Sequence, residues 1–247
     1  MIESSRNSLS VLEAIHDTDE GGVTVVAEET GLAKSTVHDH VETLIELGYV
    51  VRTDEGLRLS YRFLGFGLDL RRRTRASAEA AAKVTQLANR TGERAHYIVE
   101  EGGDAVFLFS ETGENAVETD VSPGYREPLY ATASGTAILA HLPEDRIDAI
   151  VAAIDFESVD RESVADEAAL RQELDRVRSA DVAYNEGEYI RNLWSVAAPV
   201  FDGDGRLLGS MSVSAPVHRL QHEGVRDDLR ATLLETVNEL ELDIAYA

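Results

Sequence analysis

The polar side chains best suited to contact a nucleic acid lie in one short stretch, residues 34–40 (KSTVHDH). Lysine and hydroxyl groups bind phosphate oxygens, and histidine or aspartate side chains can reach base edges in the major groove. Ser35 or Thr36 could also cap the N-terminus of a helix, which is compatible with a phosphate contact. The two histidines could equally be ordinary solvent-facing side chains. The candidate DNA-binding residues are Lys34, Ser35, Thr36, His38, Asp39 and His40.

Two short helices would present these side chains. Apolar residues recur at three- and four-residue spacing in 23–27 and again in 37–45, and Gly31 lies in the corner between them, where a positive φ is needed. Two helices joined in this way form a helix-turn-helix, whose second helix lies in the major groove of DNA. Residues 49–60 then predict a strand, a turn and a strand, the wing of a winged helix. A small helical subdomain with a hairpin and no nucleic acid is the alternative.

Length and composition favour an intracellular protein without a bound metal or cofactor. A chain of 247 residues is long enough for one large or two ordinary domains. It has no cysteine, which excludes disulfides and thiolate metal sites, and its seven histidines show no metal-ligand spacing. We find no signal segment and no apolar run of membrane-spanning length, so we expect a cytoplasmic protein that does not enter a membrane.

The net charge of −23, from 46 acidic and 23 basic residues, conflicts with DNA binding, which depends on neutralising phosphates. The acidity is uneven, since residues 1–75 carry nine Lys/Arg against thirteen Asp/Glu and the rest carry fourteen against thirty-three. Only Lys34 and Lys83 are lysines. An acidic, lysine-poor surface is typical of a salt-rich cytoplasm, where repulsion is screened, so we interpret it as adaptation to a halophilic cell. The competing interpretation is that the acidity excludes nucleic acid.

The remaining pattern predicts a second domain. Residues 61–76 form a helix whose end holds the cluster Arg71, Arg72, Arg73 and Arg75, which could touch DNA or simply favour a helix C-terminus. The following residues predict strands, then helices, then further strands, a pattern typical of an α+β domain with one mainly antiparallel sheet. We place the first domain at residues 1–68, with a linker helix to about 76, and the second at 69–247. The expected helices are 77–90, a helix within 128–142, 144–154, 165–179 and 221–245, and the expected strands are 95–99, 105–110, 116–121, 182–185, 195–201 and 206–214.

Three segments resemble the IclR-type transcriptional regulators. Residues 128–142 (PLYATASGTAILAHL) are similar to the HATASGKALLA motif of that family, and residues 183–216 (AYNEGEYIRNLWSVAAPVFDGDGRLLGSMSVSAP) to its closing signature. Residues 32–50 fit its winged helix. The resemblance implies an α+β fold, an N-terminal winged helix-turn-helix followed by a GAF/PAS-like effector-binding domain. It also implies a homodimer or tetramer that binds double-stranded operator DNA and a small-molecule effector, often a carboxylic, aromatic or sugar-derived acid, and controls catabolic genes.

The resemblance also implies a ligand site. The serine hydroxyl groups of this site could bind carboxylate or hydroxyl groups of a ligand, although each serine could equally be an ordinary sheet residue bonded to backbone. Asn185 stands where the family often has aspartate, Ser195 where many members have cysteine, and Asn192 where glycine is usual. Tyr130 replaces a histidine and Asp39 an arginine of the recognition helix. The implied ligand-binding residues are Ala133, Ser134, Asn185, Glu188, Ser195, Ser212 and Ser214.

Our leading hypothesis is a ligand-responsive DNA-binding regulator. An enzyme is the second hypothesis, but Ser134 lacks the G-x-S-x-G elbow of a nucleophile and no paired His and Asp are placed to activate it. A sensor that signals through a protein partner is the third, motivated by the acidic surface.

Overall fold

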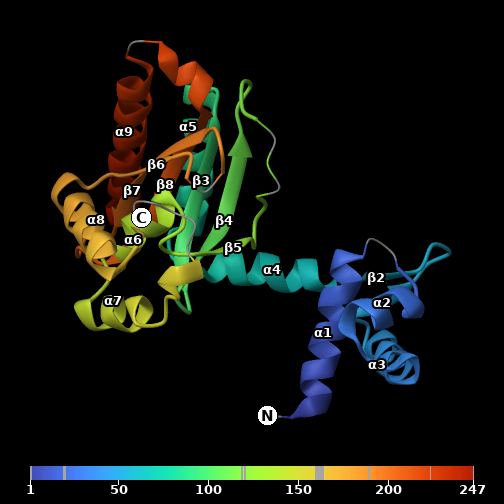
Figure 1. Ribbon diagram of the computed structural model, residues 1–247. Helices are drawn as coiled ribbons and strands as arrows, with labels where there is room; N and C mark the ends of the chain where they lie inside the picture. The colour runs from blue at the N-terminus through green and yellow to red at the C-terminus, as the bar shows by residue number, and fades with distance from the viewer. Residues whose placement is uncertain are drawn as a thin grey trace. The chain divides into compact units, whose positions relative to one another are not determined.

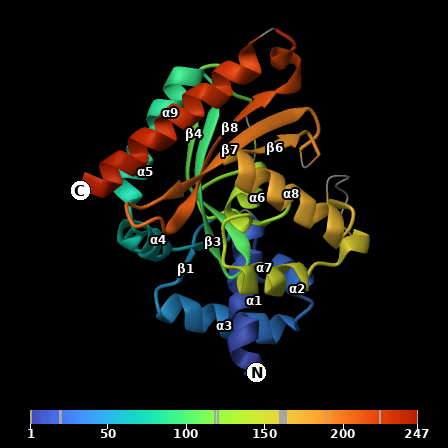
Figure 2. The ribbon, with the colours of Figure 1, turned by 90° about the vertical axis from the view of Figure 1, so that its left-hand side faces the viewer.

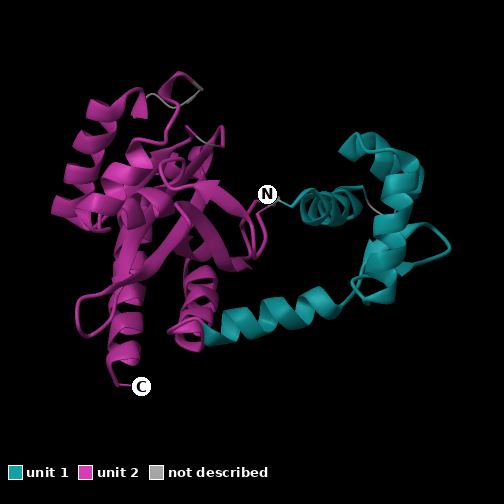
Figure 3. Ribbon diagram, turned by 90° about the horizontal axis from the view of Figure 1, so that it is seen from below, with its two compact units in different colours: residues 1–73 teal, residues 74–247 magenta. Residues whose placement is uncertain are grey.

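The computed structural model describes residues 2–18, 21–117, 119, 121–158, 164–188, 190–222 and 224–246. Contacts divide the chain into two compact units, Met1–Arg73 and Thr74–Ala247 (Figure 3). Each unit has a hydrophobic core of its own, so each is described by itself.

The first unit is a winged helix. Gly31 ends α2 with a φ of +68°, as the predicted corner requires. Apolar side chains from the three helices and the wing, including Val26, Val41 and Leu57, form its core. The two strands of the wing pair antiparallel, with Val50 opposite Leu59. Its elements are α1 (Glu3–Asp17), α2 (Val23–Thr30), α3 (Lys34–Glu46), β1 (Val50–Arg52), β2 (Leu57–Leu59) and α4 (Arg62–Arg73).

The helix that follows the wing is shorter than predicted. The prediction of one helix over 61–76 is wrong at its end, because α4 stops at Arg73 and Ala76 takes a left-handed φ of 59° before the next helix begins. None of the residues of α4 is buried. Its first turn packs against Tyr49, which lies between α3 and β1, and the ring centroids of Phe63 and Tyr49 are 5.5 Å apart.

The second unit is an α+β domain built on one antiparallel sheet, in the order β5-β4-β3-β8-β7-β6 among the described strands (Figure 1). Its strands are β3 (Arg94–Glu101), β4 (Asp104–Thr112), β5 (Arg126–Pro128), β6 (Ala183–Glu186), β7 (Leu193–Phe201) and β8 (Leu207–Pro216). Its helices are α5 (Ser77–Thr91), α6 (Ala133–Leu139), α7 (Glu144–Val151), α8 (Glu167–Ala180) and α9 (Val225–Tyr246), with short 3₁₀ turns η1 (Phe156–Ser158) and η3 (Val217–Gln221).

Helices cover both faces of this sheet. Helices α5 and α9 lie side by side on one face and bury residues such as Tyr97 and Met211 against it (Figure 2). Helices α6, α7 and α8 cover the other face, over residues such as Ile98 and Ala197. Because side chains alternate along a strand, Arg94 and His96 share the face of Ile98, opposite to Tyr97.

One predicted strand is wrong. The described residues of 116–121 are not a strand, and residues 118 and 120 lie outside the described part of the chain. The edge of β4 pairs instead with the short β5. The carbonyl groups of Val117, Thr119 and Val121 accept hydrogen bonds from the side chain of Arg94 at 3.2–3.4 Å, so a side chain replaces strand pairing there. None of the helices in the described ranges is long and apolar enough to cross a membrane.

Candidate functional site

The predicted DNA-contacting side chains occupy the N-terminal half of α3. Lys34, Ser35, His38 and Asp39 are exposed, and Thr36 is half-buried. Ala33 is the N-cap of the helix, and no side chain caps it by hydrogen bonding, so the expected capping by Ser35 or Thr36 is not found. Ala33 has extended backbone angles that are suited to an N-cap, and its position places both hydroxyls already inside the helix.

The two histidines of α3 have different surroundings. His40 is half-buried, and its Nδ1 lies 2.9 Å from the hydroxyl of Ser8 on α1, so it joins two helices of the winged helix. His38 is exposed and lies 3.8 Å from a carboxylate oxygen of Glu42. The same carboxylate pairs with Arg52 of the wing at 2.5 Å. Helix α3 and the wing therefore carry His38 and Arg52 on one connected surface.

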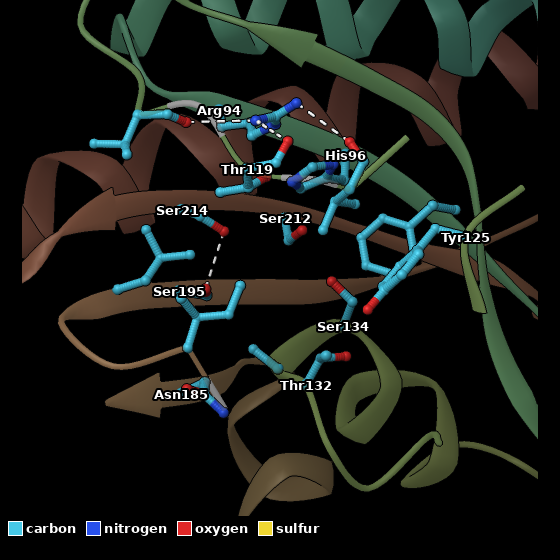
Figure 4. Close-up of a pocket in the computed structure, with 16 residues that line it drawn as sticks. Arg94, His96, Thr119, Tyr125, Thr132, Ser134, Asn185, Ser195, Ser212 and Ser214 are labelled. Atoms are coloured by element: carbon cyan, nitrogen blue, oxygen red, sulfur yellow. Dashed lines mark hydrogen bonds between the residues drawn. The ribbon is translucent and has the colours of Figure 1, made fainter. Parts of the chain in front are cut away.

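A cavity lies between the sheet and α6 in the second unit (Figure 4). Its volume is about 50 Å³. A bound water needs roughly 10–15 Å³ by the same measure, so the cavity has room for only a few water-sized groups unless side chains move. The residues that line it are Arg94, His96, Phe107, Val117, Thr119, Val121, Tyr125, Thr132, Ala133, Ser134, Asn185, Ile190, Leu193, Ser195, Ser212 and Ser214.

Six of the seven predicted ligand residues meet in this cavity. The sheet brings three of them into a single row, because Asn185 of β6 is opposite Ser195 of β7, and Ser195 is opposite Ser214 of β8. Arg94 of β3 continues the row opposite Ser214. The hydroxyls of Ser195 and Ser214 are 2.9 Å apart, so one donates a hydrogen bond to the other (Figure 4). Ser212 lies in the next row, opposite His96.

Helix α6 supplies the other wall. The hydroxyl of Thr132 accepts a hydrogen bond from the N–H of Gly135 at 3.0 Å and so caps the helix. Ser134, in the first turn, is buried, and its carbonyl accepts a hydrogen bond from the hydroxyl of Ser210 on β8. Gly135 has no room for a side chain, because a Cβ there would lie 2.2 Å from the carbonyl oxygen of Leu129. The small residues of this segment therefore allow the helix to approach the backbone of the preceding loop.

Of the two predicted ligand residues Asn185 and Glu188, only Asn185 lines the cavity. Asn185 is buried, donates to the carbonyl of Ala131 at 3.3 Å and accepts the N–H groups of Gly187 and Glu188 at 3.2 Å. Glu188 itself is not among the residues that line the cavity. Asn192 has a φ of +67°, which explains why its position favours glycine or asparagine.

The sequence analysis did not predict Arg94 and His96, which bring a guanidinium and an imidazole group to the cavity wall. His96 is only 5% exposed, and its ring packs edge-on against Phe107 with the centroids 5.1 Å apart. Burial, and then the positive charge of Arg94, lower the pKa of His96 from 6.5 to about 3, so the imidazole is neutral. The missed signal was the alternation along 94–98, which gives Arg94 and His96 one face of the strand.

A winged helix followed by a separate α+β domain, whose small cavity is lined by apolar side chains together with serines and an arginine, defines a class of DNA-binding proteins that carry a ligand-binding domain. The chain belongs to the IclR family of transcriptional regulators. The family's domain pattern described as "Bacterial transcriptional regulator IclR C-terminal" matches residues 72–242, and the pattern of the IclR helix-turn-helix domain matches residues 6–54.

Relatives match along the whole chain. The probable HTH-type transcriptional regulator ArcR of Halobacterium salinarum is 29% identical over 252 residues, which cover 100% of this chain and 95% of the relative. The crystal structure of the Thermotoga maritima IclR has a TM-score of 0.81 at 23% identity and covers 100% of both chains. An IclR homolog from Microbacterium hydrocarbonoxydans, complexed with 4-hydroxybenzoate, has a TM-score of 0.81 at 21% identity and covers 98% of this chain and 99% of its own.

These similarities confirm the predicted family and the α+β fold with an N-terminal helix-turn-helix. The protein is a transcriptional regulator with a DNA-binding domain and an IclR-type effector domain. Its relatives are regulators and not enzymes, in agreement with the missing nucleophile elbow. Within the described residues, no group of three or more His, Cys, Asp or Glu could hold a metal ion.

Proposed function

We propose that this protein is a homodimeric or homotetrameric cytoplasmic regulator that binds operator DNA through α3 and a small acidic metabolite in the cavity, and that it controls catabolic genes. Residues 1–68 would bind DNA, residues 69–247 would bind the effector, and helix α4, which ends at Arg73, would link them. The observation that carries the proposal is the cavity, because it gathers hydroxyl groups and an arginine from distant segments of the chain.

Exposed polar side chains of α3 support the DNA contact. Lys34 and the hydroxyls of Ser35 and Thr36 are suited to phosphate oxygens, and His38 and Asp39 to base edges. The Ser8 contact leaves His40 less suited to a base edge than His38. The acidic composition and the resemblance to a Halobacterium relative support a salt-rich cell, where a protein with a net charge of −23 can approach DNA because repulsion is screened.

The chemistry of the cavity supports an acidic ligand. Arg94 is the one charged side chain among the described residues that line it, and a guanidinium group binds carboxylates well. Hydroxyl groups that can donate to an anion come from Ser134, Ser195, Ser212 and Ser214. Ala133 and Asn185 also line the cavity. Glu188 stays a prediction, since it lies beside Asn185 and not on the wall.

An apolar surface on α4 supports the dimer. Tyr61 before this helix, and Leu64, Phe66, Leu68 and Leu70 within it, are between 46% and 78% exposed. Covering such a surface with a second copy would remove it from water, which favours association. Ligand binding would act by favouring one arrangement of the two copies, so that the spacing of the paired recognition helices changes relative to two half-sites.

The test is footprinting of the purified protein on its own upstream DNA in molar KCl, with and without small carboxylic, sugar-derived and aromatic acids. We expect a protected pseudo-palindrome whose protection changes with one acid. Protection that no acid changes would contradict the effector role. The absence of protection at every salt concentration would contradict DNA binding and favour a sensor that acts through a protein partner.

A further inference from the structure

His96 is a buried polar side chain that has a ring nitrogen without a hydrogen-bond partner in the described part of the chain. It lines the cavity beside Ser212 and Thr119 (Figure 4). Its Nδ1 is buried and has no hydrogen-bond partner among the described residues. Leaving such a group unsatisfied destabilises the folded protein, so native proteins seldom bury one without a bound water or ligand. The structure therefore shows a built polar position that a molecule in the cavity can satisfy.

The charge state of His96 restricts what it can bind. A neutral imidazole has one N–H donor and one nitrogen acceptor. It can accept a hydrogen bond from a hydroxyl or donate one to a keto oxygen, but it supplies no positive charge for a second carboxylate. Its surroundings disfavour protonation, because the ring is buried against Phe107 and Arg94 stands on the same face of β3.

Arg94 and His96 are two residues apart on β3, so their side chains lie next to each other along the cavity wall. The guanidinium group bonds to the carbonyls of Val117, Thr119 and Val121 at 3.2–3.4 Å, distances at the long end for hydrogen bonds. Charge-assisted bonds to a carboxylate are shorter and stronger than bonds to a neutral carbonyl. A cation and a neutral hydrogen-bonding ring thus stand side by side above the hydroxyls of Ser212 and Ser214.

We propose that His96 is a specificity-determining residue of the effector site, which binds an uncharged hydroxyl or keto oxygen of a small monocarboxylate while Arg94 binds the carboxylate. This inference rests on the proposed function, because it assumes that the cavity binds the effector. The preferred ligand would carry one negative charge and one neutral oxygen function. Dicarboxylates, zwitterionic amino acids and uncharged amides would bind less well. The small cavity volume favours an acid with few non-hydrogen atoms.

The test begins with a matched set of probes on the full-length protein in molar KCl. The hydroxy and keto monocarboxylates are glycolate, lactate, pyruvate and 4-hydroxybenzoate. The controls are acetate without the hydroxyl, glycolamide without the charge, malonate with a second carboxylate, and glycine with an ammonium group. Binding is measured by calorimetry, and the thermal shift of Trp194 fluorescence gives a second readout. We expect one of the hydroxy or keto monocarboxylates to bind most tightly. Tightest binding of a control, or no binding of any probe, would overturn the proposal.

Two variants then separate specificity from folding. His96→Phe keeps a ring of similar size against Phe107 and should weaken the best hydroxy or keto acid roughly tenfold, while the affinity of its analogue without that oxygen stays unchanged. His96→Asn keeps a donor and an acceptor and should restore most of the preference. An equal loss for both acids in His96→Phe would mean that His96 only supports the structure, and would overturn the proposal.

Arg94→Gln is the companion variant. It should weaken the acid roughly 30-fold and leave the binding of the matching amide unchanged. Arg126→Gln, an arginine of β5 that pairs with Glu101 and Asp104 away from the cavity, is the matched control and should bind as the wild type does. If Arg94→Gln binds the acid as tightly as Arg126→Gln does, Arg94 does not bind the carboxylate. None of these measurements needs DNA, so failure of operator binding in the footprint is distinguishable from failure of this inference.

Discussion

The recognition helix and the effector cavity present their polar groups in opposite ways. On α3 the six candidate contacts lie within seven consecutive positions, and most of them are exposed to water. In the cavity they come from β3, β6, β7, β8 and α6, and Ser134, Asn185, Ser212 and Ser214 are buried. An exposed group keeps its hydration until DNA displaces it, whereas a buried group must find a partner in the folded protein. Substitutions on α3 should therefore change binding, and those in the cavity should also change stability.

The largest expected effect is at Gly135, where helix and loop backbones meet. Gly135→Ala would place a Cβ against the backbone of Leu129 and should lower the free energy of unfolding of the second unit by about 3 kcal/mol. Urea unfolding followed by the fluorescence of Trp194, the one tryptophan of the chain, measures this unit. Gly65→Ala on α4, where a Cβ meets no atom within 4 Å, is the control and should not lower stability. Equal stability of both variants would contradict the close packing of α6.

The two histidines of α3 test the comparison within one helix. His38→Ala should reduce the preference for the operator over other DNA by about 1–2 kcal/mol, because it removes an exposed side chain near the bases. His40→Ala should instead lower the stability of the winged helix by about 1 kcal/mol, because it removes the bond to Ser8. Competition binding and thermal unfolding measure the two effects. A loss of operator preference that is larger in His40→Ala would reverse the assignment.

The neutral state of His96 should give the second unit a pH-dependent stability. The pKa of His96 is lowered from an ordinary 6.5 to about 3 in the folded protein. Between these two pH values the imidazole is protonated in the unfolded chain and neutral in the folded chain. This contribution is complete above pH 6.5 and is lost as the pH falls toward 3, at about 1.4 kcal/mol per pH unit. Urea unfolding between pH 7 and pH 5 should show a shallower loss in His96→Phe than in the wild type. Parallel pH profiles would show that His96 takes up protons equally in both states.

The smallest expected effect is at Glu42, whose carboxylate lies between His38 and Arg52. Glu42→Gln should strengthen operator binding about threefold at moderate salt, because it removes a negative charge beside the candidate contact His38 and the cation of Arg52, and exposed ion pairs contribute little to stability. The gain should shrink in molar KCl. Glu28→Gln, on the exposed side of α2, should change operator binding less. Weaker binding in Glu42→Gln would mean that this carboxylate itself contacts a base.

The winged helix and the cavity also differ in how far they could be predicted from the sequence. The winged helix was predictable because its signals are local: the apolar spacing of α2 and α3, the glycine of the corner and a short hairpin. Ser212 and Ser214 were predicted from the resemblance of residues 183–216 to the family's closing signature. The row that joins Arg94 to Asn185 was not, because it depends on which strands are neighbours and in which register.

A similar limit explains the wrong strand at 116–121. Its residues have strand-like composition, but β4 pairs with β5, and the guanidinium group of Arg94 occupies the carbonyls that a ladder would have used. A side chain that competes with strand pairing cannot be inferred from periodicity, because the periodicity describes only the segment itself.

The most direct test of the central claim, that one unit binds DNA and the other binds the effector, is a comparison of two variants in both assays. Operator affinity and affinity for the tightest-binding acid of the probe set are measured for Ser35→Ala/Thr36→Ala and for Arg94→Gln. The first should weaken operator binding and leave acid binding intact. The second should leave operator binding intact and remove both acid binding and the response of the operator complex to the acid. Unchanged operator binding in the first variant, or unchanged acid binding in the second, would contradict this division of roles.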